Sequence, residues 1–154
     1  VWTWKVFKYK AGWLRLYSNK RNTMTTLNEK KTSVLDESTL TSLGGTSGLA
    51  SPLVKRVITL YRQEATKLVH GIESACKSDD QEILLRAAHT LKSSSASIGA
   101  YALAQVAKQI EHFARQASIT EAKALLAQLL SEFTRLMDEL NFFEQKLTPI
   151  NDLA

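Results

Sequence analysis

AAHTLKSSSASIGA, residues 87–100, is the segment around which the rest of this 154-residue chain is arranged. Apolar or small residues recur there every three or four positions, which is the spacing of one buried helical face. The residues on that face are Leu84, Ala87, Ala88, Leu91, Ser95 and Ile98. The spacing predicts an amphipathic helix over about 80–97, capped by Ser78 or Asp79. Gly99 ends it in the left-handed conformation that glycine tolerates.

His89 falls on the outer side of this helix, away from the apolar face. Its neighbours one and two turns away are Leu85, Lys92, Ser93 and Ala96, and together the five form one surface patch. A neutral imidazole has one nucleophilic ring nitrogen, so it can accept a phosphoryl group. The small side chains of Ser93 and Ala96 let a second protein approach the ring, and Lys92 supplies a mobile positive charge for phosphoryl oxygens.

The run Ala88, His89, Leu91, Lys92 and Ser93, followed by small residues and Gly99, resembles the motif of the histidine-containing phosphotransfer (HPt) domain. The resemblance extends over about residues 34–141. Ser93 departs from the family pattern, in which glycine is commoner, but serine still leaves room. The resemblance implies that His89 accepts the phosphoryl group and that Lys92 stabilises its charge. It also implies a docking surface for the partner at Leu85, Arg86, Ser93 and Ala96.

The same resemblance implies the function of an intermediate in a phosphorelay. The chain would take a phosphoryl group from the aspartate of one response-regulator receiver domain and pass it to another, as a free-standing protein or as part of a hybrid sensor kinase. It would be a monomeric, cytoplasmic phosphocarrier without kinase activity and without a cofactor, because the receiver would bring the magnesium. The chain has no nucleotide-binding glycine motif, and no Arg-Thr-Pro follows His89 as in the dimerising helix of sensor kinases.

Four long amphipathic helices with short connections predict an all-α, antiparallel up-down four-helix bundle, preceded by a short extra helix. The short helix spans about 37–43 behind the cap Asp36, and Gly44–Gly48 form a plain loop after it. Ser51-Pro52 starts the first long helix, and Thr120 caps the last. The long helices are expected at 52–76, 80–97, 101–117 and 121–146. The predicted domain therefore covers 34–147, with a tail at 148–154.

The first long helix has an expected apolar face that begins with Leu53, Val57 and Leu60 and continues through Tyr61, Ala65, Leu68, Ile72 and Ala75. Residues around Val54, Ile58 and Tyr61 are expected to adjoin the docking surface next to His89.

The formal charge of +5 is distributed unevenly. Residues 1–33 hold eight basic residues and one acidic residue, whereas the remainder holds 12 basic and 14 acidic residues. The basic character therefore belongs to the N-terminal segment, and nucleic-acid binding by the domain is not expected. Cys76 is the only cysteine. No segment is apolar enough for a membrane span. His70 and His112 have no neighbours at the spacing of a metal site or a catalytic triad.

Residues 1–17 contain all three tryptophans among lysines and arginines, and 18–33 resemble a polar linker. The first stretch is compatible with a short hairpin, an interfacial membrane segment, a nucleic-acid-binding arm, or the remnant of a linker or leader. A chain that begins with Val1 is consistent with a fragment of a larger protein. These residues also support an alternative function, a helical adaptor that presents a basic arm to an acidic partner such as nucleic acid.

Overall fold

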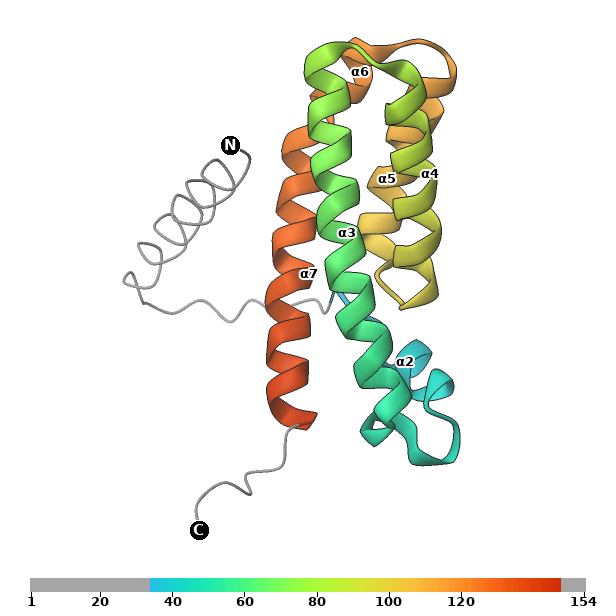
Figure 1. The fold of residues 1–154 in the computed structure, drawn as a ribbon, viewed down its shortest axis with the longest axis vertical. Coiled ribbons are helices and arrows are strands. Elements are labelled where there is room, and N and C mark those ends of the chain that lie inside the picture. Colours follow the sequence, from blue (N-terminus) through green and yellow to red (C-terminus); the bar gives the residue numbers. More distant parts are fainter. Residues whose placement is uncertain (1–33, 148–154) are drawn as a thin grey trace, which may run out of the picture. The chain divides into compact units, whose positions relative to one another are not determined.

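The computed structural model describes residues 34–147. Over that range the fold is an antiparallel helical bundle in which α3 and α7 lie side by side, next to α4 and α5 (Figure 1). The short helix α2 lies at one end of the bundle and α6 at the other. The predicted all-α four-helix bundle with a short N-terminal helix is confirmed. Its elements are α2 (Glu37–Leu43), the 3-10 helix η1 (Gly45–Ala50), α3 (Pro52–Ser78), α4 (Gln81–Ser97), α5 (Tyr101–Arg115), α6 (Ile119–Ala124) and α7 (Leu126–Leu147).

The predicted extension at 1–33 and the tail at 148–154 lie outside the described residues, so the domain boundaries stay predictions. No helix within 34–147 combines the length and the apolar character needed to cross a membrane.

Side-chain caps start three of these helices. The Asp36 carboxylate accepts a hydrogen bond from the Ser38 amide at the start of α2. Ser51 accepts one from the Leu53 amide at the start of α3. The cap of α4 is Asp80, not Ser78 or Asp79 as the sequence suggested, because Asp79 adopts φ 56° and closes α3 instead. The loop expected after α2 contains the short helix η1.

The last helix differs from its prediction. Ala117 adopts φ 55°, and the Ser118 amide donates to the carbonyl of Phe113 at 2.9 Å, which closes α5 after Arg115. The next helical turn therefore begins at Ile119, and Thr120 lies inside it rather than capping it. The helix is then interrupted at Leu125, so two helices, α6 and α7, replace the single continuous helix that was expected.

The N-terminal half of α3 faces the core with a different set of residues from the one predicted. Val54 and Ile58, which were not predicted, are buried together with the predicted Tyr61, whereas Leu53 and Leu60 are 55% and 54% exposed. Both sets satisfy helical spacing, and they differ by a rotation of about 100°. The observed face continues directly into the buried residues Ala65, Val69, Ile72 and Cys76. Val54, Ile58 and Tyr61, which were expected to adjoin the docking surface, are therefore core residues, and the docking surface itself stays a prediction.

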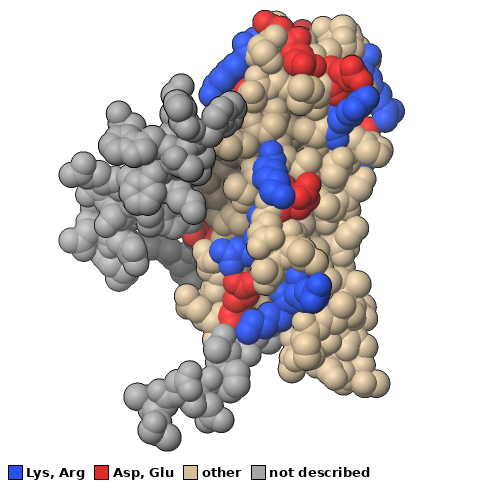
Figure 2. Space-filling view, viewed as in Figure 1, with Lys and Arg blue, Asp and Glu red and all other residues tan. Residues whose placement is uncertain are grey.

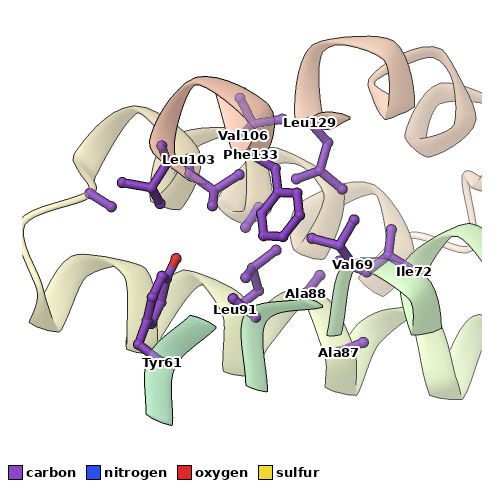
Figure 3. Packing of buried hydrophobic residues seen from close by; sticks show 14 of the residues in the cluster. Tyr61, Val69, Ile72, Ala87, Ala88, Leu91, Leu103, Val106, Leu129 and Phe133 are labelled. Carbon is purple, nitrogen blue, oxygen red and sulfur yellow. The ribbon is translucent and has the colours of Figure 1, made fainter. Parts of the chain in front are cut away.

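Tyr61 lies among the packed apolar side chains of the core (Figure 3). A buried hydrogen bond joins it to α4, because its hydroxyl lies 2.8 Å from the Ser95 hydroxyl, and Ser95 is fully buried, as expected for a small residue on the inner face. Burial raises the pKa of Tyr61 to about 12, although the hydrogen bond with Ser95 opposes the shift. This pair aligns the middle of α3 with the C-terminal half of α4, the helix that carries His89.

Candidate functional site

His89 lies on the outer side of α4, and 56% of its side chain is exposed. The opposite side of α4 is held in the core by Leu84, Ala88 and Leu91. The helix therefore carries the imidazole to the surface at a rigid position, because its backbone is fixed by packing on the other side.

The side chains predicted to surround His89 differ in accessibility. Ser93 and Arg86 are exposed, and Arg86 forms an ion pair with Glu82 one turn earlier on α4. Ala96 is partly exposed. Leu85 is also only partly exposed, because it packs against the core. All four lie on α4.

The imidazole is anchored by a buried carboxylate from the neighbouring helix, Glu111 of α5. Oε1 of Glu111 lies 2.9 Å from Nδ1 of His89 and 2.6 Å from Nη2 of Arg115, while Oε2 lies 2.7 Å from Nζ of Lys92. Only 5% of the Glu111 side chain is exposed. One carboxylate thus binds three nitrogen groups from two helices.

Glu111 is ionised at neutral pH despite its burial. Burial by itself would raise the pKa of this carboxyl, but hydrogen bonds from Lys92 and His89 and the positive charges of Lys92 and Arg115 lower it to about 2. An ionised carboxylate can only accept hydrogen bonds, so Nδ1 of His89 must be the donor. The proton on Nδ1 leaves the lone pair of a neutral imidazole on Nε2, the ring nitrogen away from Glu111.

The charges of this cluster do not cancel. Lys92 and Arg115 carry two positive charges against the single negative charge of Glu111, so one positive charge remains beside a neutral His89. The Lys92 side chain is 30% exposed and that of Arg115 is 62% exposed. The arrangement can therefore attract an anionic group to the exposed edge of the imidazole.

Gly99 follows the end of α4 with φ +84°, a conformation that side chains rarely tolerate. A Cβ atom there would lie 2.7 Å from the Asp36 carbonyl oxygen, and the Asp36 amide donates to the Gly99 carbonyl at 3.0 Å. Gly99 thus lets the chain turn into α5 while the start of α2 packs directly against it. This turn brings Glu111 back alongside His89.

Glu111 and Arg115 were not among the residues predicted from the sequence. Glu111 falls four residues after the buried Ala107 and seven after Ala104, on the inner face of α5. A carboxylate at such a position requires a positively charged or hydrogen-bonding partner, and Arg115 one turn later was a visible candidate. The pairing with His89 and Lys92 was not visible, because they lie on a different helix.

The other two histidines have ordinary surface positions. Nδ1 of His70 lies 3.3 Å from Oε2 of Glu73 on the same helix, with the His70 ring largely exposed, and the exposed His112 packs edge-on against Phe113. Among residues 34–147, no group of three or more His, Cys, Asp or Glu side chains is arranged to hold a metal ion.

An exposed histidine on an antiparallel helical bundle, with the lone pair on its outward ring nitrogen, has the chemistry of a histidine phosphocarrier protein. The Hpt domain model matches residues 56–140, more than half of the chain, and this range includes the whole charged cluster. The chain belongs to the Hpt domain family. A role in phosphotransfer within a phosphorelay, with receiver domains as partners, follows from this membership.

One solved structure is similar in fold, the histidine-containing phosphotransfer protein B (HptB) from Pseudomonas aeruginosa PAO1. The TM-score is 0.65 at 24% sequence identity, and the match covers 75% of this chain and 96% of that chain. No curated protein sequence matches this chain.

Proposed function

We propose that Nε2 of His89 takes a phosphoryl group from the aspartyl phosphate of one receiver domain and gives it to the aspartate of another. The observation that carries the proposal is the hydrogen bond from Nδ1 of His89 to the ionised Glu111. This bond selects the tautomer whose nucleophilic lone pair is on the exposed nitrogen.

In the forward step, the Nε2 lone pair forms a bond to phosphorus while the bond between phosphorus and the aspartate oxygen breaks. The electron pair of that bond leaves with the aspartate as a carboxylate. The ring becomes a phosphorylated imidazolium, which keeps its proton on Nδ1. The negative charge of Glu111 faces that proton and stabilises the positive ring. Since a protonated ring is also a good leaving group, the same contact supports the reverse transfer to the second receiver.

Lys92 and Arg115 have the charge needed to stabilise the phosphoryl oxygens. Lys92 was predicted to do so, and its hydrogen bond to Glu111 keeps its ammonium group near the ring. Arg115 shares Oε1 with His89, which holds its guanidinium within about 5.5 Å of Nδ1, the sum of the two hydrogen-bond lengths. Its greater exposure makes Arg115 the cation that can reorient toward the phosphoryl group at the lower cost.

We also propose that the chain acts without a nucleotide or a cofactor of its own and that magnesium enters with the receiver. This part rests on the division of labour expected from the family. Monomeric state and cytoplasmic location remain predictions. The adaptor alternative depends on residues 1–33, which lie outside the described part of the chain.

The test is the incorporation of acid-labile, base-stable phosphate after mixing with a phosphorylated receiver domain and magnesium. The proposal expects label in the parent and none in His89→Gln, whereas His70→Gln and His112→Gln serve as matched controls that keep the label. Labelling of His89→Gln at the parental rate, or no labelling of the parent by any of a panel of active receivers, would refute it.

A further inference from the structure

One row of side chains on α3 alternates between apolar and charged residues. Positions four apart in a helix form a ridge along its surface, and on α3 such a ridge consists of Pro52, Arg56, Leu60, Glu64 and Leu68. The first four of these residues are exposed, and the last is partly exposed. The row therefore has a leucine at its centre, opposite charges one turn to either side, and an apolar residue at each end.

Apolar surface lies beside the centre of this row. Leu60 is 54% exposed, and Leu53, seven residues earlier and therefore on nearly the same side of α3, is 55% exposed. Val57, one turn before Leu60, packs partly against the core. Figure 2 views the molecule with α3 in front and shows charged side chains of both signs in separate places there, with uncharged surface between them. A leucine from another helix can therefore pack beside Leu60 between charged groups.

The two charged residues of the row are held only weakly within the chain. Among residues 34–147, Arg56 forms no ion pair. Glu64 lies 3.4 Å from Lys67 on the same helix, and the two side chains are 55% and 74% exposed. An exposed pair of this kind contributes little to stability. Both charges are therefore available to a partner that brings the opposite charge.

The row is complementary to a second copy of itself. Two helices that pack with their four-residue ridges side by side cross at about −50°. A two-fold axis at Leu60 makes the two ridges run in opposite directions, so the two Leu60 side chains meet at the axis. Positions four residues before and four residues after the centre then become neighbours. Arg56 of each copy lies next to Glu64 of the other, and Pro52 lies next to Leu68, so opposite charges and apolar groups are matched.

We propose that two copies of this chain associate through α3, with Leu60 at the two-fold axis and Arg56 of each copy paired with Glu64 of the other. The proposal does not rest on the function of His89, since none of its residues belongs to the charged cluster around the imidazole. It departs from the monomeric state that the family resemblance implied. The row spans about 24 Å of helix. A contact of this length is at the small end of protein interfaces, so the dimer should form and dissociate with protein concentration.

The test is sedimentation equilibrium of the full chain over a range of protein concentrations. Arg56→Glu should raise the dissociation constant of the dimer about tenfold or more, because each of two symmetric contacts then brings two carboxylates together. The exchange Arg56→Glu/Glu64→Arg restores opposite charges across the axis and should return to within about threefold of the parent. The matched control is Lys55→Glu, which makes the same change of charge at an exposed position about 100° away around α3. It should also stay within about threefold of the parent.

Leu60→Gln tests the centre of the contact independently, because it removes apolar surface from both copies without a change of charge. It should raise the dissociation constant about tenfold. Ile83→Gln is its matched control, since Ile83 of α4 is 51% exposed and lies outside the row, and it should leave the dissociation constant unchanged.

A parent that stays monomeric at every concentration would overturn the proposal. A dimer that is equally tight in Arg56→Glu and Leu60→Gln, or that Lys55→Glu weakens as much, would show that another surface or net charge holds the copies together. Failure of the charge exchange to restore the dimer would rule out the pairing of Arg56 with Glu64. A monomeric parent in which Arg56→Glu raises KM for a receiver domain would assign the row to the receiver instead. None of these results depends on whether His89 is labelled.

Discussion

Replacing Glu111 with glutamine removes the negative charge that binds His89, Lys92 and Arg115 but keeps the size of the side chain. Folding lowers the pKa of Glu111 from the ordinary 4.5 to about 2. At 1.36 kcal/mol per pKa unit, the charged form stabilises the folded state by about 3 kcal/mol. Because Glu111 is only 4% exposed, solvent screens this contribution little. Glu111→Gln should therefore lower the free energy of unfolding at pH 7 by about 3 kcal/mol.

The pH dependence of the stability difference between the parent and Glu111→Gln provides a second, independent test. A carboxyl group whose pKa is lowered by folding contributes its full stability at pH values above its pKa in the unfolded state. This contribution is lost as the pH falls toward the pKa of the folded state. The difference between the parent and Glu111→Gln should thus be constant from pH 7 to about 5 and decrease to about 1.4 kcal/mol at pH 3.

Urea unfolding followed by circular dichroism at pH 7, 5 and 3 measures both quantities. Glu82→Gln is the matched control, because Glu82 is a largely exposed carboxylate that also binds an arginine, and its effect should stay within about 0.5 kcal/mol. A Glu111→Gln variant as stable as the parent at pH 7 would contradict the prediction. A difference that remains undiminished at pH 3 would show that packing, and not charge, accounts for the loss.

Three further changes test other parts of the structure. Gly99→Ala should lower the free energy of unfolding by about 1–3 kcal/mol, because Gly99 has a positive φ and lies close to the Asp36 carbonyl. The matched control is Gly71→Ala, because a Cβ atom at Gly71 would make only ordinary contacts. It should be neutral or stabilising by up to about 1 kcal/mol in the same urea titration. Tyr61→Phe should cost about 1–3 kcal/mol, because it leaves the buried Ser95 hydroxyl without a partner, and a double variant with Ser95→Ala should recover part of the loss. Arg115→Gln should slow receiver-dependent phosphorylation of His89 about tenfold, with partial rescue by Arg115→Lys, and equal rates in all three proteins would contradict a role for this charge.

Sequence periodicity could not decide which side of α3 faces the core. Two overlapping apolar sets, one beginning with Leu53 and the other with Val54, both have helical spacing, so the sequence allowed either to face the core. The packed helices selected the second set, since it continues the buried row through Val69 and Cys76, which the first set lacks. Leu53 and Leu60 were therefore left on the surface, which only the structure shows.

The sequence by itself determined the features that depend on residues close together in the chain. The helix with an outward-facing His89, the small residues beside it, the turn at Gly99 and the cap at Asp36 all follow from spacing within a few residues. The tertiary structure decided what joins that histidine to the rest of the domain. Glu111 lies 22 positions further along and reaches Nδ1 only because α5 folds back against α4. The tautomer of His89 depends on this contact between two helices, and helical periodicity within either helix carries no information about it.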